Sequence, residues 1–361
     1  MPGGEGPGAW GPGVGLRIGT GPTSAVLPPF PNRDDDGRDG LGGGRGDGCA
    51  SGEARAAVAR DITIGVDVWQ FGCELDELRE AWRLADGGGF DNLWVCDHFL
   101  PVVPRADYQA PIFEAWSMLA AMAEVTTRVR LGVMVSGNTY RHPGVLAKIA
   151  VTVDHLSGGR LEFGIGAAGS TTGPDEHLQL GLEFPSTAER IRRLGEACTV
   201  IKKLWTDEVA DFDGRYYRLT GAIARPKPVQ RPHPPIWIGG DGERLTLRVV
   251  AEHADVWNAI GLNPTGQPGG GIPELAHKMA VLDQHCADVG RDPRAIRRSV
   301  QVMLNRGDVD GTVRRIEDLL EVGFTHVLLL VPPPNPVPAV ELAIRDVLPH
   351  FGRPSSPGRG A

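Results

Sequence analysis

Two polar residues that can carry proton chemistry, Asp97 and His98, directly follow a run of apolar residues. Three large apolar side chains in succession, Leu93, Trp94 and Val95, are typical of a parallel strand covered on both faces. Residues just beyond the carboxyl end of such a strand point into the functional crevice, where an imidazole can act as acid or base. We therefore predict a catalytic His98; the alternative is a structural histidine paired with Asp97 or a backbone carbonyl.

A glycine-rich stretch offers a second kind of chemistry. Positions 239–243 read Gly-Gly-Asp-Gly-Glu and follow a predicted strand. Backbone N–H groups in such a loop, at the start of a helix, can bind a phosphate; the alternative is a tight turn that needs glycine for its dihedral angles. We favour the phosphate site. Positions 164–169 lack the third glycine of a dinucleotide fingerprint, but they let the backbone approach a flat ring.

Residues near other predicted strand ends would complete a substrate pocket. Asp67 ends the first strand, and Trp69, Phe99 and Trp257 supply aromatic surface that favours an apolar or aromatic substrate. The alternative is that these aromatic side chains serve only packing.

No metal site is predicted. Asp67, His98 and His142 could converge as ligands of a barrel hydrolase, but no strand offers a His-x-His pair. The five cysteines are scattered singly, without a CxxC pair. We read them as reduced thiols.

The elements that must position these residues follow a strand–helix rhythm. Strands are predicted at 62–68, 92–96, 129–135, 161–165, 236–238, 255–259, 298–303 and 325–330. Helical spacing follows each of them, at 75–85, 115–123, 143–153, 187–205, 243–251, 272–289, 312–322 and 337–348. Eight such units predict a (β/α)8 TIM barrel, an α/β fold, rather than a doubly wound sheet. Residues 207–235 break the rhythm and form an insertion after the fourth unit.

Composition indicates a globular domain with flanking tails. Of the 361 residues, 41% are hydrophobic, and no apolar run approaches the roughly 20 residues that span a bilayer. A net charge of -8 offers no basic stripe for nucleic acid. Residues 1–60 are rich in Gly, Pro, Asp and Arg, so we predict a disordered tail there and another at 353–361, around a barrel domain at 61–352. With no secretory signal recognised, a cytoplasmic location is expected.

Four segments carry a likeness to a known family: GFDNLWVCDH at 89–98, RLGVMVSGNTYRHP at 130–143, DHLSGGRL at 154–161 and PIWIGG at 235–240. Together they resemble the bacterial luciferase-like monooxygenase family, and within it the branch that uses the deazaflavin coenzyme F420. The likeness runs from about residue 62 to residue 351.

The resemblance implies a barrel with a flavin or deazaflavin ring at its C-terminal mouth, often in a homodimer. It places His98 near the reactive carbon of the ring, and it implies a non-proline cis peptide between Met134 and Val135 that backs the ring. With the glycine-rich stretches above, the expected cofactor-binding residues are Asp97, Met134, Val135, Ser136, Asn138, Gly166, Ala167, Gly239, Gly240, Asp241, Gly242 and Glu243.

Three functions follow as expectations. The first is an oxidoreductase that transfers a hydride between F420 and a small organic substrate. The second is an FMN-dependent monooxygenase that uses O2 and needs a flavin reductase as partner. The third is a barrel that binds the cofactor without turnover; its support is positions 166–170, which contain no acid where sugar-phosphate dehydrogenases of the family carry a glutamate. The same departure argues against a sugar-phosphate substrate.

Overall fold

The computed structural model describes residues 62–102, 109–169, 172–260 and 271–353. Apart from Arg353, the predicted tails lie outside these residues. The described strands of the main sheet are β1 (Thr63–Val68), β2 (Asn92–Val95), β3 (Arg130–Val133), β4 (Ser136–Gly137), β5 (Leu161–Gly166), β8 (Ile236–Gly239), β9 (Val256–Ala259), β10 (Arg297–Met303) and β11 (His326–Val331).

The sheet closes on itself as a parallel barrel. Strand β1 pairs with β2 on one side and β11 on the other, and the order continues through β10, β9, β8 and β5. Pairing of β3 with β5 completes the ring, with the short β4 as a continuation of β3 beside β5. The predicted (β/α)8 barrel is therefore confirmed.

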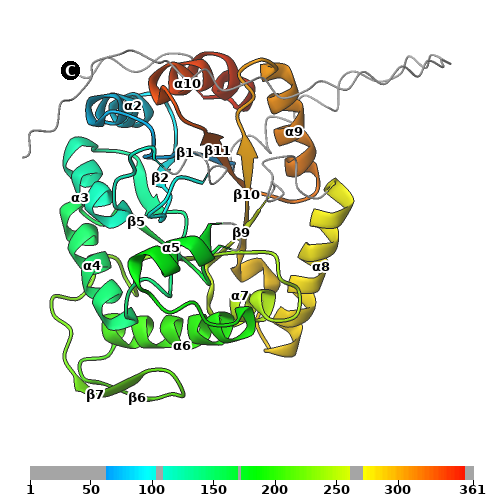
Figure 1. Cartoon of the computed structure of the whole chain (residues 1–361). Helices are drawn as coiled ribbons and strands as arrows, with labels where there is room; N and C mark the ends of the chain where they lie inside the picture. Colours follow the sequence, from blue (N-terminus) through cyan, green and yellow to red (C-terminus); the bar gives the residue numbers. More distant parts are fainter. Residues whose placement is uncertain (1–61, 103–108, 170–171, 261–270, 354–361) are drawn as a thin grey trace, which may run out of the picture. The chain divides into compact units, whose positions relative to one another are not determined.

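Helices surround the barrel (Figure 1). They are α2 (Leu75–Gly87), α3 (Ala115–Val125), α4 (Pro143–Leu156), α5 (Gly173–Leu180), α6 (Thr187–Thr206), α7 (Thr246–His253), α8 (Ile272–Asp288), α9 (Val309–Glu321) and α10 (Pro336–Leu342), with short turns η2 (Pro293–Ala295), η3 (Ala343–Val347) and η4 (Leu348–Phe351). Helix α5 was not predicted. The predicted insertion contains an antiparallel hairpin, β6 (Ala210–Asp213) and β7 (Arg218–Ala222), which projects beyond α6.

Local sequence explains where several helices begin. Glu114 accepts hydrogen bonds from the backbone N–H of Trp116 and Ser117 at the start of α3. His142 accepts one from Gly144 N at the start of α4, where Pro143 occupies the first turn. His142 is thus a capping residue. Within the described residues no helix is both long and apolar enough to cross a bilayer, and no group of three potential metal ligands is found.

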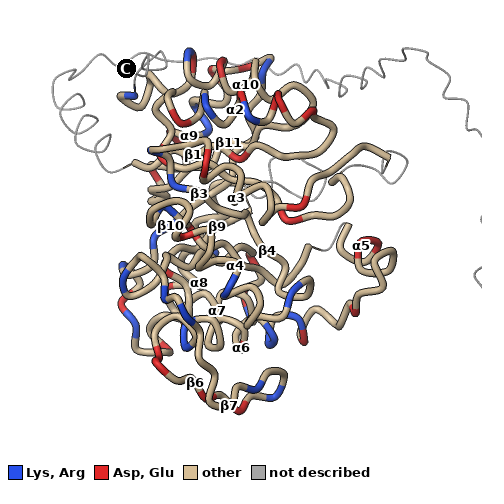
Figure 2. The backbone as a smooth tube through the Cα atoms, turned by 90° about the vertical axis from the view of Figure 1, so that its left-hand side faces the viewer, with Lys and Arg blue, Asp and Glu red and all other residues tan. Residues whose placement is uncertain are grey.

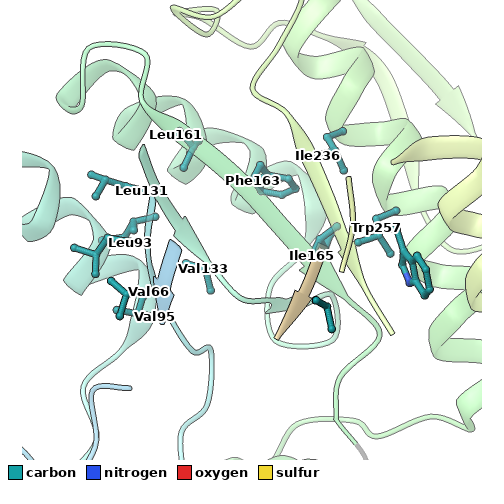
Figure 3. Close-up of a cluster of buried hydrophobic side chains, with 14 of the residues drawn as sticks. Val66, Leu93, Val95, Leu131, Val133, Leu161, Phe163, Ile165, Ile236 and Trp257 are labelled. Carbon is teal, nitrogen blue, oxygen red and sulfur yellow. The ribbon is translucent and has the colours of Figure 1, made fainter. Parts of the chain in front are cut away.

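Two layers of core follow from the alternation of side chains along each strand. Leu93 and Val95 point outward to the helices, in the layer shown in Figure 3. Trp94, between them, points into the barrel and packs edge-on against Trp237, with ring centroids 4.6 Å apart. The inner cluster comprises Trp94, Met134, Trp237, Val256 and Leu328. The barrel interior is therefore filled, and separate cavities lie at its two ends.

Candidate functional site

A cavity of about 290 Å³ lies at the carboxyl ends of the strands, where barrel enzymes carry their active sites. Its walls come from residues far apart in the sequence. Eight of the residues predicted for the site line it: Asp97, His98, Met134, Val135, Gly166, Ala167, Gly239 and Gly240.

Glu176, on helix α5, holds the imidazole of His98. Nδ1 of His98 lies 3.0 Å from Oε1 of Glu176, whose side chain is fully buried. The same oxygen accepts hydrogen bonds from the backbone N–H of Phe99 at 2.8 Å and of Leu100 at 3.1 Å. Burial opposes ionisation, but the hydrogen bond and charge of His98, with the other donors, lower the pKa of Glu176 to about 2.

The ionised state of Glu176 decides which nitrogen of His98 is available. A carboxylate only accepts hydrogen bonds, so Nδ1 of His98 carries the proton that points to Glu176. Nε2 then has no hydrogen-bond partner among the described residues, and the imidazole lines the cavity. His98 is therefore oriented as a proton acceptor toward whatever occupies the cavity.

Tyr140 completes the surroundings of Glu176. Its hydroxyl donates a hydrogen bond to Oε2 of Glu176 at 2.5 Å, and the residue lines the cavity. Burial and the negative charge of Glu176 raise the pKa of Tyr140 far above its usual range, so the hydroxyl stays protonated. Phe99, which we expected in the pocket wall, does not line the cavity; it packs edge-on against the Tyr140 ring at a centroid distance of 4.8 Å.

Asp97 is held by Arg141. The two side chains form a bidentate ion pair, with distances of 2.6 and 3.0 Å, and Gly137 N donates to Asp97 at 3.2 Å. Arg141 also pairs with Glu114. Burial raises the pKa of Asp97, while the charge of Arg141 opposes that rise. Asp97 thus fixes the loop that follows β4, beside the cavity that it helps to line.

A cis peptide bond joins Met134 and Val135, as the family resemblance implied. Glycines opposite this bond make room for the Val135 side chain. A Cβ atom at Gly166 would lie 2.6 Å from Cγ2 of Val135, and one at Gly239 would lie 3.3 Å from it. Met134, Val135, Gly166 and Gly239 therefore form one continuous, largely apolar wall of the cavity.

Ser136 and Asn138, both predicted to bind the cofactor, are buried beside the cavity and are not part of its lining. Oγ of Ser136 accepts a hydrogen bond from Trp116 Nε1 at 2.7 Å, which gives it a structural role. Asn138 donates through Nδ2 to the carbonyl of Arg190 at 3.1 Å. Oδ1 of Asn138 is buried and has no partner in the described chain, so an acceptor remains free there.

The stretch after β8 does not open a helix as predicted, because α7 begins only at Thr246. Neither carboxylate of this stretch lines the cavity. Asp241 accepts a hydrogen bond from Ile260 N at 3.2 Å, and burial raises the pKa of Asp241 to about 6. Glu243 forms an ion pair with Lys278 at 3.2 Å.

Only the first part of the predicted phosphate loop remains at the cavity. Gly239 and Gly240 line it together with Thr246, whereas Gly242 does not. Gly240 has a φ of 122°, a backbone conformation that side chains rarely allow. The predicted loop is therefore reduced to Gly239 and Gly240, with Thr246 added.

Asp67 and Trp69, two predicted pocket residues, contact each other outside the lining of the cavity. Trp69 Nε1 donates to Oδ2 of Asp67 at 3.2 Å. Oδ1 of Asp67 is buried without a partner among the described residues, and burial raises the pKa of this carboxyl to about 7.

Trp257 does not line the pocket, contrary to the prediction. Its neighbours Val256 and Asn258 point into the barrel, so the alternation along β9 turns Trp257 outward. There it is fully buried in the outer core (Figure 3), and Nε1 donates to the carbonyl of Gly240 at 2.9 Å. The residue supports the glycine loop from behind.

Arg190 is a site residue that the sequence did not reveal. It lines the cavity and is 95% buried; its guanidinium donates to the carbonyls of Ala167 at 2.9 Å and Pro185 at 2.6 Å. No carboxylate pairs with it among the described residues, and burial lowers the pKa of Arg190. Nothing in the sequence distinguishes it from the neighbouring Arg192 and Arg193 of α6 except its helical phase.

The family model of luciferase-like monooxygenases matches residues 59–315. The chain belongs to this family. It is 35% identical over 172 residues to the F420-dependent glucose-6-phosphate dehydrogenase of Microbacterium testaceum, a match that covers 47% of this chain and 48% of that protein. The chain spans about half the length of the curated relatives it matches.

Two solved structures show the same fold. An F420-dependent secondary alcohol dehydrogenase in complex with an F420-acetone adduct matches with a TM-score of 0.67 and 19% identity, over 80% of this chain and 99% of that one. A long-chain alkane monooxygenase matches with a TM-score of 0.64 and 16% identity, over 81% and 92% of the two chains. The same barrel fold thus serves enzymes with different reactions, and the reaction must be argued from the site.

Proposed function

We propose that this protein is an oxidoreductase that transfers a hydride between coenzyme F420 and a small organic substrate. The observation that carries the proposal is the imidazole of His98 at the cavity wall, fixed through Nδ1 by the buried Glu176. The bound deazaflavin would supply the carbon that gives or accepts the hydride. Relatives named as F420-dependent dehydrogenases support this choice of cofactor.

The cavity has features that fit a flat ring with an anionic tail. The wall around the cis peptide, built with Gly166 and Gly239, is apolar and lets the backbone approach closely. The buried guanidinium of Arg190 lacks a carboxylate partner in the described chain and would hold negative charge.

The residues of the chain would manage the proton that accompanies hydride transfer. Nε2 of His98 accepts the proton of a substrate hydroxyl during oxidation, or returns it to the substrate oxygen during reduction. Glu176 keeps Nδ1 protonated and stabilises the imidazolium formed in the first case. Positions 166–170 after β5 contain no acid, but Glu176 supplies a carboxylate from α5, which favours a catalytic barrel over a non-catalytic one.

The lining favours a small apolar or aromatic substrate. Met134, Val135, Ile191 and Ile260 give the cavity apolar surface, and Tyr140 adds an aromatic side chain. Arg190 is the sole basic side chain besides His98 among the described lining residues. If it holds the cofactor tail, no second cation is left for a sugar phosphate, so we expect glucose 6-phosphate to be a poor substrate.

Titration with oxidised F420 and, separately, with FMN tests the cofactor. We expect saturable binding of F420, followed by its absorbance, at least tenfold tighter than binding of FMN. Tight binding of FMN alone, with O2 consumption when reduced FMN is supplied by a reductase, would instead establish the monooxygenase.

Turnover is tested with 1-phenylethanol and oxidised F420, and with acetophenone and reduced F420. The His98→Ala variant should bind F420 with wild-type affinity and lose most of this activity, because it removes only the proton acceptor. Binding without turnover of either pair, or of glucose 6-phosphate, would favour the non-catalytic barrel. A homodimer, implied by the family resemblance, also remains a proposal, which light scattering of the purified protein tests.

A further inference from the structure

A second and larger cavity, of about 570 Å³, lies at the other end of the barrel. It is lined by residues at the amino ends of the strands, including Thr63 of β1, Asn92 of β2 and Arg297 of β10. The inner cluster around Trp94 and Trp237 fills the barrel between this lower cavity and the cavity that contains His98. A ligand in the lower cavity would therefore not touch the proposed active site.

Guanidinium groups dominate the charge of the lower cavity. Three arginines line it, Arg128, Arg130 and Arg297, against two carboxylates, Asp91 and Glu162. In Figure 2, Lys and Arg segments lie, among Asp and Glu segments, along the edge of the barrel that faces away from α5. The negative charge of Asp91 is balanced by Arg353, which does not line the cavity and forms an ion pair with Asp91 at 2.7 Å. The cavity thus has an excess of positive charge.

Two of the arginines have no carboxylate partner among the described residues. The Arg297 guanidinium lies 3.4 Å from Nε2 of His326, and it forms no ion pair with Glu162, although its charge opposes the rise that burial causes in the pKa of that carboxyl. Burial and the charge of Arg297 lower the pKa of His326 to about 4, so this imidazole is neutral at pH 7. Arg128 donates to the backbone carbonyls of Asp86 at 2.8 Å and Ala85 at 3.5 Å. Both side chains are exposed at the rim, with donors left over.

The floor beneath these arginines is polar and its side chains are hydrogen-bonded to one another. Glu162 is buried and accepts hydrogen bonds from Arg130 and from Trp237 Nε1. Arg130 donates further to Gln230 at 2.7 Å and to the carbonyl of Leu161 at 3.1 Å. These contacts hold Arg130 and leave the guanidiniums at the rim as the groups available to a ligand.

We propose that the lower cavity is a binding site for a small oxyanion with two or more negative charges, recognised by Arg128 and Arg297. Guanidinium groups bind phosphate and carboxylate oxygens through paired N–H donors, and an open polar cavity of this size admits an organic molecule that carries such groups. Asn92, Gln230 and the neutral His326 add uncharged hydrogen-bonding groups.

Calorimetric titration of the full chain at constant ionic strength tests the site, with inorganic phosphate, pyrophosphate and citrate as probes. We expect at least one of them to bind, and its affinity to fall about tenfold or more in Arg297→Gln and in Arg128→Gln, since each removes a charged donor. Arg297→Lys should bind the anion with intermediate affinity, because lysine keeps the positive charge but lacks the paired N–H donors of a guanidinium group. Binding of the phosphates alone or of citrate alone identifies the anionic group.

The control variant is Arg314→Gln on α9, which removes an exposed arginine that lines neither cavity. It should bind the anion as the wild type does. All four variants alter exposed side chains, and their thermal unfolding is measured to confirm that they fold. The proposal is overturned if none of the probes binds with a Kd below about 10 mM. It is also overturned if Arg297→Gln and Arg128→Gln bind the anion as tightly as Arg314→Gln does. Displacement of the anion by saturating F420 would overturn it too, because it would place the anion in the cavity that contains His98.

Discussion

Replacement of Glu176 by glutamine is the sharpest test of how the site works. The glutamate side chain is fully buried and accepts hydrogen bonds from Phe99 N, Leu100 N, His98 Nδ1 and the Tyr140 hydroxyl. Glutamine keeps the shape but has one oxygen in place of two, and its NH2 group is a donor. At least one of the four donors therefore loses its acceptor, and the negative charge beside His98 is gone.

The effect on stability follows from the pKa. Burial raises the pKa of Glu176, but the hydrogen bond and charge of His98, together with the hydrogen bonds from Tyr140 and Leu100, lower it on folding from 4.5 to about 2. A difference of this size corresponds to about 3 kcal/mol of unfolding free energy. Because the folded-state pKa is depressed, this contribution is complete above pH 4.5 and is lost as the pH falls toward 2. Glu176→Gln lacks the contribution, so we expect it to be less stable at pH 7 and to approach the wild type at low pH.

The effect on catalysis follows from the orientation of His98. Without an ionised partner, Nδ1 no longer holds its proton in place and the imidazolium is less stabilised, so we expect hydride transfer to slow about 100-fold. Stopped-flow absorbance of bound F420 measures this step with 1-phenylethanol or the best substrate found. The affinity for F420 should change little, since Glu176 does not line the cavity.

The matched control is Glu183→Gln, which makes the same chemical change at an exposed residue paired with Arg193. It should retain the wild-type rate. If Glu176→Gln also transfers hydride at the wild-type rate while it folds and binds F420, then the His98–Glu176 pair has no part in proton transfer and the reasoning is refuted.

Three further predictions concern other parts of the site. Arg190→Gln should weaken F420 binding about tenfold and make it less dependent on salt concentration, as measured by absorbance titration. If Arg193→Gln and Arg190→Gln bind F420 with equal affinity, Arg190 does not hold the cofactor tail. Trp257→Phe should lower the unfolding free energy by about 1–3 kcal/mol, because it loses the hydrogen bond to Gly240. The KM for the substrate should stay unchanged, and a large rise in KM would show that Trp257 does contact the substrate. Burial raises the pKa of Asp67 from 3.8 to about 7 in the folded state. The protonated carboxyl therefore stabilises the fold at low pH, and up to about 4 kcal/mol of unfolding free energy is lost as the pH rises from 4 to 7. Asp67→Asn should remove this loss in urea unfolding across that range, and a parallel pH dependence in both proteins would contradict it.

Much of the barrel could be predicted because its strands are buried on both faces. The succession of Leu93, Trp94 and Val95 needs cover on both sides, and eight such strands with intervening helices leave few alternatives to a closed barrel. The position of His98 beyond β2 follows from the same reasoning, because the carboxyl ends of parallel strands meet at one rim. The cis peptide between Met134 and Val135 was predicted from the family resemblance, and it is present in the structure.

Because both faces of these strands are buried, the sequence did not show which side chains point into the barrel and which point outward. All four residues of β9 are buried, so no alternation of buried and exposed positions revealed that the Trp257 side chain turns outward. The partners of Asp241 and Glu243 lie on elements up to 35 residues away, and only the packed structure brings Lys278 to Glu243.

The sequence by itself determined the barrel, the rim at which we propose the active site and the imidazole placed there. Tertiary structure alone decided what holds that imidazole. Glu176 lies 78 residues beyond His98, on a short helix with little amphipathic character, and the local sequence did not predict this helix. The proton on His98 is assigned by a contact that forms only when the barrel closes, because the chain between the two residues carries no local signal of their pairing.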